Sequence, residues 1–320
     1  MFAQNITRIP QMSKRFIVTG GAGFIGLHLV EFLVGQGHLV IAIDDLSAGS
    51  YADIIAIGAV ENFIQAPVEK VSLHDLGKVD GLFHLAAQAS VPLSISAFGS
   101  SSSSNVLSSI NVIDYCSSTD TPLIYASSSA VYGNLPFGDE SLSTDLLSPY
   151  AVDKLVMEMY CKVAHKLRAL RSFGLRFFNV YGPRQDPLNP YSGVISIFAS
   201  QILRKESITI NGGYQTRDFI YVDDVVRGLW ASYLYLTDNS VSAVSNLLTG
   251  RSISINELAD QLMILTGHDV EKIYQPLSDG DPEKSLGSLK LMHDLLNIKE
   301  FTKLENGLKA VLAWMEMSNG

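Results

Sequence analysis

Short apolar segments alternate with longer segments of helical periodicity through the first half of the chain. The apolar segments have the length of strands and are bounded by polar residues or glycine: 14–19, 38–43, 62–66, 81–85, 122–126 and 174–178. Helix-length stretches lie between them, notably 27–33, 105–118 and 150–170. This alternation predicts an α/β fold, a doubly wound parallel sheet covered by helices on both faces.

The pattern becomes irregular after about residue 180, where glycine and proline are more frequent. We therefore expect a Rossmann domain over 14–183, to which 214–250 returns, and a smaller C-terminal region formed by 184–213 and 251–320. The serines at 100–104 are expected to form a loop or the start of a helix, not a site.

A glycine-rich turn follows the first predicted strand and opens the helical stretch 27–33. Glycines let the backbone approach a pyrophosphate, and a helix N-terminus offers free N–H groups and a positive dipole end. Strand, glycine turn and helix in this order predict a dinucleotide site. The expected contacts in this turn are Gly20, Gly23, Phe24, Ile25 and Gly26.

The second predicted strand ends at Asp44-Asp45, close to the spacing of an acid that binds an adenosine ribose. An acid there favours NAD over NADP, because it repels a 2′-phosphate. The alternative is a plain glycine turn followed by an acidic strand end.

Tyr150 and Lys154 lie four residues apart on a predicted helix, so their side chains share one face. An ammonium beside a phenol favours the phenolate and lowers a pKa that starts at about 10. Tyr150 is therefore a candidate base for a substrate alcohol. The spacing alone arises by chance on many solvated helices, and the predicted dinucleotide site gives it weight.

Composition describes an ordinary globular protein, with 47% hydrophobic and 17% charged residues. The sequence has no apolar run of about eighteen residues and no signal-peptide pattern, so we expect no membrane span. Cys116 and Cys161 have no metal-ligand spacing and are expected to be reduced thiols in a cytoplasmic protein without a metal site. A net charge of −9 argues against nucleic acid as a partner.

The chain resembles the extended short-chain dehydrogenase/reductases and, within them, the nucleotide-sugar 4-epimerases, over about residues 14–315. The motifs that carry this resemblance are the Gly20–Gly26 loop, Asp44, His84-Leu85-Ala86-Ala87, Asn105-Val106, Ser127 to Gly133, Tyr150 with Lys154, and Arg217 to Asp224. The resemblance implies a tightly bound NAD that is regenerated in each turnover. It adds to the cofactor contacts Val68, Leu85, Ala86, Ala87, Asn105, Tyr150 and Lys154.

The resemblance also implies a mechanism. Tyr150 takes the proton of the sugar O4 while C4 gives its hydride to NAD, and the 4-keto sugar takes the hydride back on its other face. Lys154 holds Tyr150 ionised and hydrogen-bonds the nicotinamide ribose. Ser128 hydrogen-bonds O4 and helps relay the proton, although its neighbours Ser127 and Ser129 leave the assignment among the three serines open.

Ala130 indicates which reaction is expected. Related sugar dehydratases and a decarboxylase carry a glutamate just before the element seen here as Val131-Tyr132-Gly133. Eliminating water needs an acid beside the leaving hydroxyl. Ser129-Ala130 supplies no carboxylate, which disfavours dehydration.

The stretch 176–187 resembles epimerases that act on UDP-N-acetylhexosamines. By this resemblance Asn179 and Arg217 contact the diphosphate, Ser128 and Ser129 contact the sugar, and the backbone of 208–213 lines the uracil. Ser285 stands where glucose-restricted relatives carry a tyrosine, which leaves room for an acetamido group. UDP-GlcNAc/UDP-GalNAc is the expected pair, with UDP-glucose/UDP-galactose and UDP-glucuronate as alternatives.

Two departures from the family pattern weaken the substrate and cofactor assignments. Ser278 replaces an arginine that precedes the Gly-Asp of the late loop, and Lys284 is a candidate point charge in its place. Pro67 replaces an aspartate that receives the adenine amino group in relatives. Arg217 could instead be a structural partner of Asp218.

Rival interpretations are a non-catalytic NAD-binding relative and a sugar reductase that works in one direction. The resemblance further implies a homodimer formed through the helices near 105–118 and 150–170, and a role in polysaccharide biosynthesis.

Overall fold

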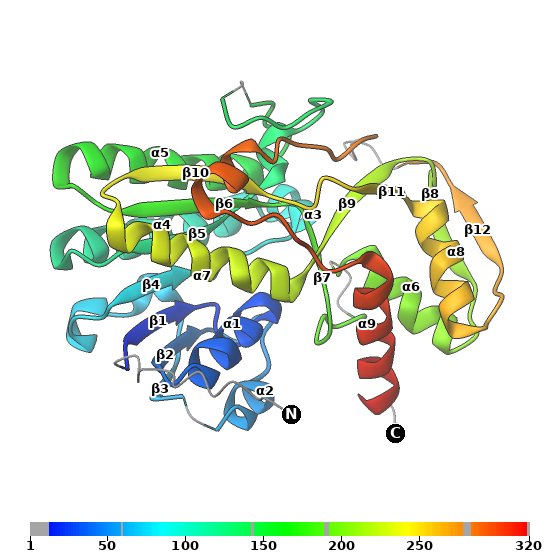
Figure 1. Ribbon diagram of the computed structural model, residues 1–320, viewed down its shortest axis with the longest axis horizontal. Helices are drawn as coiled ribbons and strands as arrows, with labels where there is room; N and C mark the ends of the chain where they lie inside the picture. Colours follow the sequence, from blue (N-terminus) through cyan, green and yellow to red (C-terminus); the bar gives the residue numbers. More distant parts are fainter. Residues whose placement is uncertain (1–12, 59, 142–143, 189–191, 278–282, 319–320) are drawn as a thin grey trace, which may run out of the picture.

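The computed structural model describes residues 13–58, 60–141, 144–188, 192–277 and 283–318. Figure 1 shows two parts, a large sheet with its covering helices and a smaller part that contains the C-terminal helix. The stretch 278–282, which holds the predicted Ser278 substitution and Asp279-Gly280-Asp281, lies outside the described residues.

The large sheet has seven strands, and every neighbouring pair in it is parallel. The chain crosses between β1 and β4 in the middle of the sheet, which is the switch point of a doubly wound fold. The spatial order is β10 (Ser242–Leu247), β6 (Ser172–Phe177), β5 (Leu123–Ser128), β4 (Gly81–His84), β1 (Arg15–Thr19), β2 (Leu39–Asp44) and β3 (Asn62–Gln65). The predicted fold class is therefore confirmed.

Helices cover both faces of this sheet because successive strand residues point to opposite faces. Phe16 and Val18 of β1 pack into a core with α1 (Phe24–Gly35) and α7 (Val222–Asp238). Ile17 faces the other way, into a core with α4 (Phe98–Thr119) and α5 (Pro149–Arg168). The two helix pairs therefore cover opposite faces of the sheet.

Helix α4 begins earlier than the predicted stretch 105–118 and includes the serines at 100–104. Ser100 Oγ donates to the Ala97 carbonyl at 3.1 Å, just before the helix, and Ser101 Oγ donates to Gln88 Oε1 at 3.0 Å. Of the two expectations for these serines, the start of a helix is therefore correct and the loop is not.

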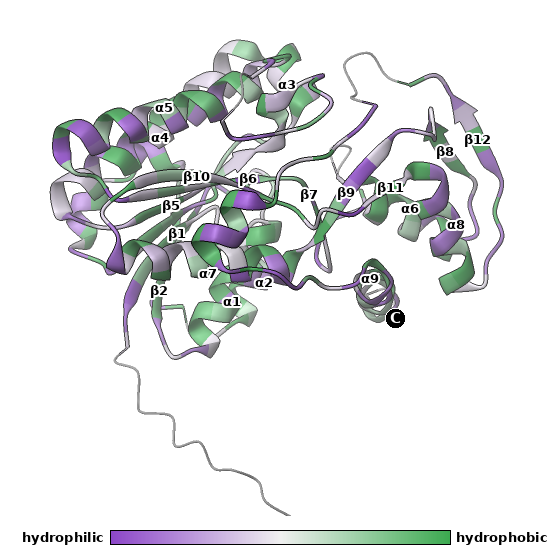
Figure 2. Cartoon of the chain, turned by 45° about the horizontal axis from the view of Figure 1, so that its top comes forward, coloured by the Kyte–Doolittle hydropathy of each residue, from purple (hydrophilic) through white to green (hydrophobic). Residues whose placement is uncertain are grey.

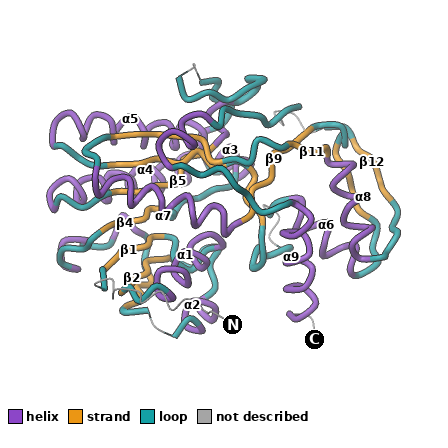
Figure 3. The backbone as a smooth tube through the Cα atoms, viewed as in Figure 1, coloured by secondary structure: helices purple, strands orange, loops and turns teal. Residues whose placement is uncertain are grey.

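The smaller part has its own hydrophobic core, which includes Ile195, Leu258 and Val311. Figure 3 shows its helices and short strands gathered beside the large sheet. Its elements are β7 (Asn179–Tyr181), α6 (Val194–Leu203), β8 (Ile208–Asn211), β9 (Thr216–Tyr221), β11 (Ser252–Ser254), α8 (Ile255–Thr266), β12 (Lys272–Gln275) and α9 (Leu304–Ser318). Strands β11, β9 and β7 form one small sheet, and β12 pairs with β8.

The chain passes between the two parts more than once. Strand β10 pairs with β6 in the large sheet. Met292 and Leu296, in the single π-helical turn η4 (Met292–Leu296), pack into the core beneath α1 and α7, so part of the predicted region 251–320 returns to the large sheet. The remaining elements are α2 (Tyr51–Ala56), α3 (Val91–Ser96) and the short 3₁₀ helices η1 (Val68–Lys70), η2 (Leu73–Leu76) and η3 (Ser129–Tyr132).

None of the helices in the described ranges combines the length and the apolar character that crossing a membrane requires.

Candidate active site

A cleft of about 1400 Å³ lies where the carboxyl ends of the parallel strands face the smaller part. Its lining includes Asp44 and Tyr150 from the large part, and Arg217 and Trp314 from the smaller one. Sites for single drug-sized ligands are typically about 300–1,000 Å³, so this cleft has room for a dinucleotide and a second ligand together. Ligands collect at this edge of open parallel sheets.

The glycine turn forms one wall of the cleft. Gly20 has φ +69°, a left-handed conformation that favours glycine. A Cβ on Gly26 would lie 1.9 Å from the Gly20 carbonyl oxygen, so no larger residue fits there. Gly23 precedes the first residue of α1, whose N-terminus opens onto the cleft. All five residues predicted for this turn line the cleft, namely Gly20, Gly23, Phe24, Ile25 and Gly26.

Asp44 ends β2 beside the glycine turn, and its side chain is held in place by backbone donors. Its carboxylate accepts from the Ala22 N–H at 3.0 Å and from the Leu46 N–H at 2.8 Å. Burial raises its pKa, against these hydrogen bonds, which lower it. Pro67 and Val68 line the same cleft, as predicted for the adenine end.

The segment after β4 is fixed by a buried pair. Thr19 Oγ1 lies 2.7 Å from His84 Nδ1, and it also accepts from the Ala86 N–H at 3.3 Å. Burial, and then the charge of Lys154, lower the pKa of His84 to about 3, so its ring is neutral. The pair thereby holds Leu85, Ala86 and Ala87 against the cleft, where they were predicted.

Asn105, predicted as a cofactor contact, is not among the described residues that line the cleft. Its side chain is buried, and both ends of its amide are used within the protein. Oδ1 accepts from the Gln88 N–H at 2.8 Å, while Nδ2 donates to the Gln88 carbonyl at 3.2 Å and to Asp153 Oδ2 at 3.0 Å. Asn105 therefore fixes the segment at Gln88, which does line the cleft.

Tyr150 and Lys154 both line the cleft from α5. The helix begins immediately before them, because Ser148 Oγ accepts from the Ala151 N–H at 3.2 Å and Pro149 stands in the first turn. Lys154 Nζ lies 5.6 Å from the centre of the Tyr150 ring and donates to the Ala126 carbonyl at 2.9 Å.

Burial governs how these two groups titrate. It raises the pKa of Tyr150, which a hydrogen bond with Ser128 lowers and the charge of Asp153 raises. It also lowers the pKa of Lys154 to about 8, against the charge of Asp153. The predicted lowering of the phenol pKa by the ammonium was wrong for the protein alone, because desolvation disfavours the phenolate more strongly.

Among the three consecutive serines, Ser128 is the one beside Tyr150. Its hydrogen bond lowers the pKa of that phenol, and it lines the cleft. The Ser127 hydroxyl points elsewhere and donates to Glu158 Oε1 at 2.5 Å. Ser129, predicted to contact the sugar, begins η3 and is not among the described residues that line the cleft.

A buried ion pair one helical turn beyond Lys154 was not predicted. Arg176 of β6 holds the Glu158 carboxylate with Nε at 2.9 Å from Oε1 and Nη2 at 2.7 Å from Oε2. The same arginine donates to Tyr132 Oη at 2.8 Å, and that hydroxyl donates to Asn246 Oδ1 at 2.6 Å. Glu158 is one helical turn beyond Lys154, so a sequence signal existed in the shared face of 150, 154 and 158.

The predicted diphosphate contacts lie on neighbouring strands. Asn179 lines the cleft and donates to the Asp218 carbonyl at 2.9 Å and to Ser285 Oγ at 3.3 Å. Arg217 lines the cleft, whereas the Asp218 carboxylate accepts from the Thr249 and Arg251 N–H groups at 2.9 and 3.0 Å. Backbone N–H groups of the segment that follows β10 therefore hold the Asp218 carboxylate.

Other predicted substrate contacts are placed as follows. Thr209 and Asn211, from the stretch 208–213 expected at the uracil, line the cleft. Lys284, the candidate point charge, is exposed and is not among the described lining residues.

Sequence reasoning missed several lining residues that carried no recognisable motif. They reach the cleft through tertiary packing, as Trp314 does from the C-terminal helix. These residues are Gln88, Ser90, Leu93, Ser104, Ser108 and Trp314.

Comparison with known proteins identifies relatives over nearly the whole chain. The family model described as "NAD dependent epimerase/dehydratase family" matches residues 16–241. A Methanocaldococcus jannaschii protein provisionally named UDP-glucose 4-epimerase is 36% identical over 315 residues, which cover 95% of this chain and 99% of that protein.

Two solved structures are similar to this chain along its length. The UDP-glucose 4-epimerase of Thermotoga maritima with UDP-glucose has a TM-score of 0.89 and 32% identity, covering 96% of this chain and 100% of that one. The UDP-N-acetylglucosamine 4-epimerase of Methanobrevibacter ruminantium M1, in complex with UDP-N-acetylmuramic acid, has a TM-score of 0.90 and 34% identity, with coverage of 96% and 100%.

Proposed function

Because the chain belongs to the NAD dependent epimerase/dehydratase family, we propose that it is an NAD-dependent 4-epimerase of UDP-hexoses. The observation that carries this proposal is the cluster of Ser128, Tyr150 and Lys154 in one cleft with the glycine turn. Ala130 adds to it, because the turn after Ser128 offers no carboxylate for an elimination.

The residues of the cleft fit NAD. The glycine turn leaves a cradle at the N-terminus of α1 that a Cβ would fill, and such a terminus favours a pyrophosphate. The oriented Asp44 carboxylate matches a ribose diol and repels a 2′-phosphate. Bound NAD supplies the hydride acceptor and, in the reverse step, the hydride donor.

The side chains of this chain move the proton. Tyr150 accepts the O4 proton through its hydrogen bond with Ser128, and it returns the proton when the keto sugar is reduced on the other face. Lys154, protonated below its pKa of about 8, favours the phenolate electrostatically.

The charges in the cleft favour a neutral sugar. Its described lining carries three cations, Lys154, Arg184 and Arg217. Arg184 pairs with Glu31 at 2.7 Å, Lys154 belongs to the proton-transfer pair, and Arg217 is proposed for the diphosphate. A hexuronate carboxylate would therefore lack a cation of its own, which disfavours UDP-glucuronate.

Among neutral sugars we propose UDP-GlcNAc/UDP-GalNAc as the preferred pair, supported by the small Ser285 next to Asn179. The test is to incubate purified protein with each UDP-sugar separately and to follow equilibration with its C4 epimer. Mixing of UDP-GlcNAc with UDP-GalNAc without added reductant supports the proposal. Failure to equilibrate any UDP-hexose, or net consumption of NADH, would contradict it.

Ser285→Tyr should restrict the enzyme to sugars without the acetamido group. Filling this space is expected to lower kcat/KM for UDP-GlcNAc by roughly 10-fold or more, since overpacking costs about 1–3 kcal/mol. The ratio of kcat/KM for UDP-GlcNAc to that for UDP-glucose measures the effect. Ser285→Ala keeps the space and should leave this ratio close to that of the wild type. If kcat/KM fell equally for both sugars in Ser285→Tyr, Ser285 would have no role in substrate selection.

We further propose a homodimer through α4 and α5. Large apolar side chains are exposed along these helices at helical spacing, in two rows: Leu107 and Ile110 on α4, and Met159, Val163 and Leu167 on α5. Figure 2 shows that both helices carry hydrophobic residues among their hydrophilic ones. An apolar row of this kind on two packed helices suits a four-helix bundle with a second copy.

Val163→Arg is accordingly expected to shift the dimer to monomer, measured by sedimentation equilibrium. Ile264→Arg on α8 is the matched control, because Ile264 is also apolar and exposed, at 79% against 50% for Val163, but lies in the smaller part. A wild-type chain that sediments as a monomer, or an unaffected dimer in Val163→Arg, would rule out this interface. The cytoplasmic location and the role in polysaccharide biosynthesis remain predictions.

A further inference from the structure

Asp153 carries a buried carboxylate and lies in the sequence between Tyr150 and Lys154, the proposed proton-transfer pair. Its side chain is 5% exposed. Its hydrogen-bond partner is Asn105 Nδ2 of α4, at 3.0 Å, and within the described ranges no ion pair neutralises it. A buried carboxylate without a cationic partner costs several kcal/mol, so its presence here calls for a reason.

The wall that faces Asp153 is uncharged. Helices α3 and α4 pack against α5, and the stretch 91–113 contains no ionisable side chain. Strand β10 likewise contributes none over its own length. Beyond residue 113, α4 carries Asp114, Tyr115 and Cys116. The ionisable groups on the other elements packed against α5 are Tyr125 of β5, Tyr132 of η3 and Arg176 of β6, and Arg176 is held by Glu158 of α5. Beyond this α5-facing wall, His84 on β4 interacts with Lys154.

The hydrogen bond of Asp153 continues to the cleft. Asn105 holds the backbone of Gln88 at both its N–H and its carbonyl, at 2.8 and 3.2 Å. Gln88 lines the cleft, and its Oε1 accepts from Ser101 Oγ at 3.0 Å. A carboxylate at 153 therefore orients the amide of Asn105, and this amide fixes one wall of the cleft.

We propose that Asp153 is a positioning residue of the reaction, which holds the Gln88 wall through Asn105 and fixes one negative charge beside Tyr150 and Lys154. This inference rests on the proposed epimerase function. The charge acts on both partners in one direction, because it opposes the loss of a proton from the phenol and from the ammonium alike. The raised pKa of Tyr150 and the retained proton of Lys154 agree with this direction.

The charge raises both pKa values, but this favours the required protonated form of Lys154 and disfavours the required ionised form of Tyr150. It keeps Lys154 protonated to a higher pH, although burial lowers its pKa to about 8. It also makes Tyr150 a stronger base that ionises later. Removing the charge should therefore lower both pKa values and move the whole pH profile of kcat towards acid.

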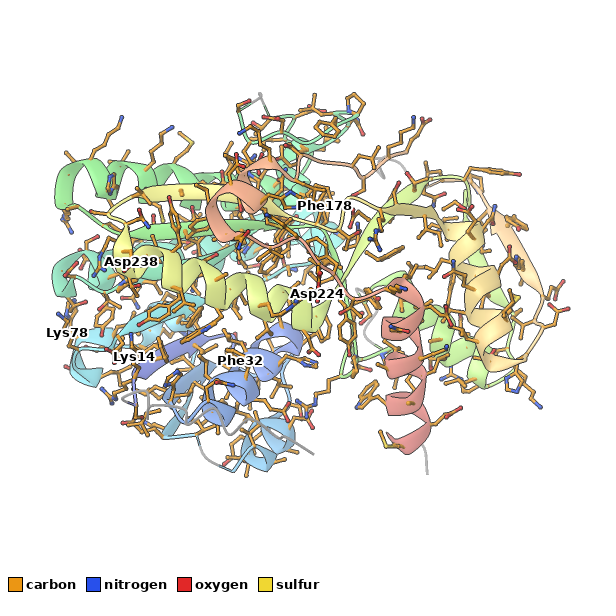
Figure 4. All side chains as sticks on the ribbon, viewed as in Figure 1. Lys14, Phe32, Lys78, Phe178, Asp224 and Asp238 are labelled. Atoms are coloured by element: carbon orange, nitrogen blue, oxygen red, sulfur yellow. The ribbon has the colours of Figure 1, made fainter. Side chains whose placement is uncertain are left out.

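Asp153→Asn tests the charge, because the amide keeps the shape and can still accept from Asn105. Both limbs of its kcat profile are expected about one pH unit lower than in the wild type, a loss of roughly tenfold on the alkaline limb. Asp238→Asn is the matched control. This exposed aspartate, labelled in Figure 4, is the last residue of α7, and its substitution should leave both limbs in place. A folded Asp153→Asn with unshifted limbs would overturn the electrostatic role.

Asp153→Leu removes the charge and the hydrogen bond together, and it leaves no unpaired polar group at 153 if the amide variant fails to fold. It should show the same shift and, in addition, a several-fold lower kcat/KM at its own optimum, because the Gln88 wall loses its anchor. Equal kcat/KM values at the two optima would overturn the positioning role.

If the proposed epimerase function is wrong, the experiments give a different result. A wild type that equilibrates no UDP-sugar would refute the epimerase, and Asp153 would then be tested by titration. The phenolate absorbance of Tyr150, taken as the difference from Tyr150→Phe, should appear at lower pH in Asp153→Asn. The same titration curve in both proteins would overturn the inference.

Discussion

Tyr150→Phe is expected to lower kcat for UDP-hexose epimerisation by roughly 10²–10⁴-fold, the usual contribution of a positioned general base. The change removes one hydroxyl from a side chain that is 9% exposed and lines the cleft with Lys154. Without this oxygen nothing at that place accepts the O4 proton, so hydride loss from C4 becomes unfavourable. Equilibration of UDP-GlcNAc with UDP-GalNAc is the measurement.

The amount of bound NAD distinguishes a loss of catalysis from a loss of the fold. The phenyl ring keeps the packing of Tyr150, so the variant should retain NAD, measured in the purified protein after denaturation. Tyr160→Phe on the exposed side of the same helix is the matched control and should change kcat by less than about twofold. A Tyr150→Phe enzyme as fast as the wild type would favour the rival interpretation, a relative that binds NAD without this chemistry.

The large sheet could be predicted because its strands are buried on both faces. Continuous apolar runs such as 38–43 end at polar residues or glycine, so six strands were found within one or two residues of their limits. The seventh strand, β10, was not predicted, because its sequence Ser-Ala-Val-Ser-Asn-Leu has no continuous apolar run. The strands of the smaller part also escaped prediction, since they have only three to six residues each, too few to show a clear period. The packing of the C-terminal helices could not be predicted either, because the order of the elements along the chain does not indicate how the smaller part is packed.

The site could be predicted where chemistry forces a local pattern. The glycine turn and the spacing of Tyr150 and Lys154 are such patterns, and both lie in one cleft. The motif did not reveal that the amide of Asn105 holds the backbone of Gln88, because a motif does not show which segment of the protein a side chain contacts. The pKa of Tyr150 was misjudged for a similar reason, since burial cannot be read from a spacing.

The ion pair of Arg176 with Glu158 carries the second large expected effect. Arg176→Met should lower the free energy of unfolding by about 3–5 kcal/mol, because it leaves the Glu158 carboxylate buried without its cation. The side chains of the pair are 6% and 7% exposed, so water cannot replace the lost partner. Urea-induced unfolding at neutral pH, compared with the wild type, measures the change.

Two variants decide whether burial of the charge is the cause. Arg168→Met breaks a pair of similar length, 2.8 Å to Asp114, whose side chains are 59% and 60% exposed, and it should cost no more than about 1 kcal/mol. Adding Glu158→Gln to Arg176→Met removes the stranded charge and should recover a substantial part of the loss, because a neutral amide is cheaper to bury. Equal losses for Arg168→Met and Arg176→Met, or a double variant less stable than Arg176→Met alone, would show that the pair acts through shape and hydrogen bonds, not through its charge.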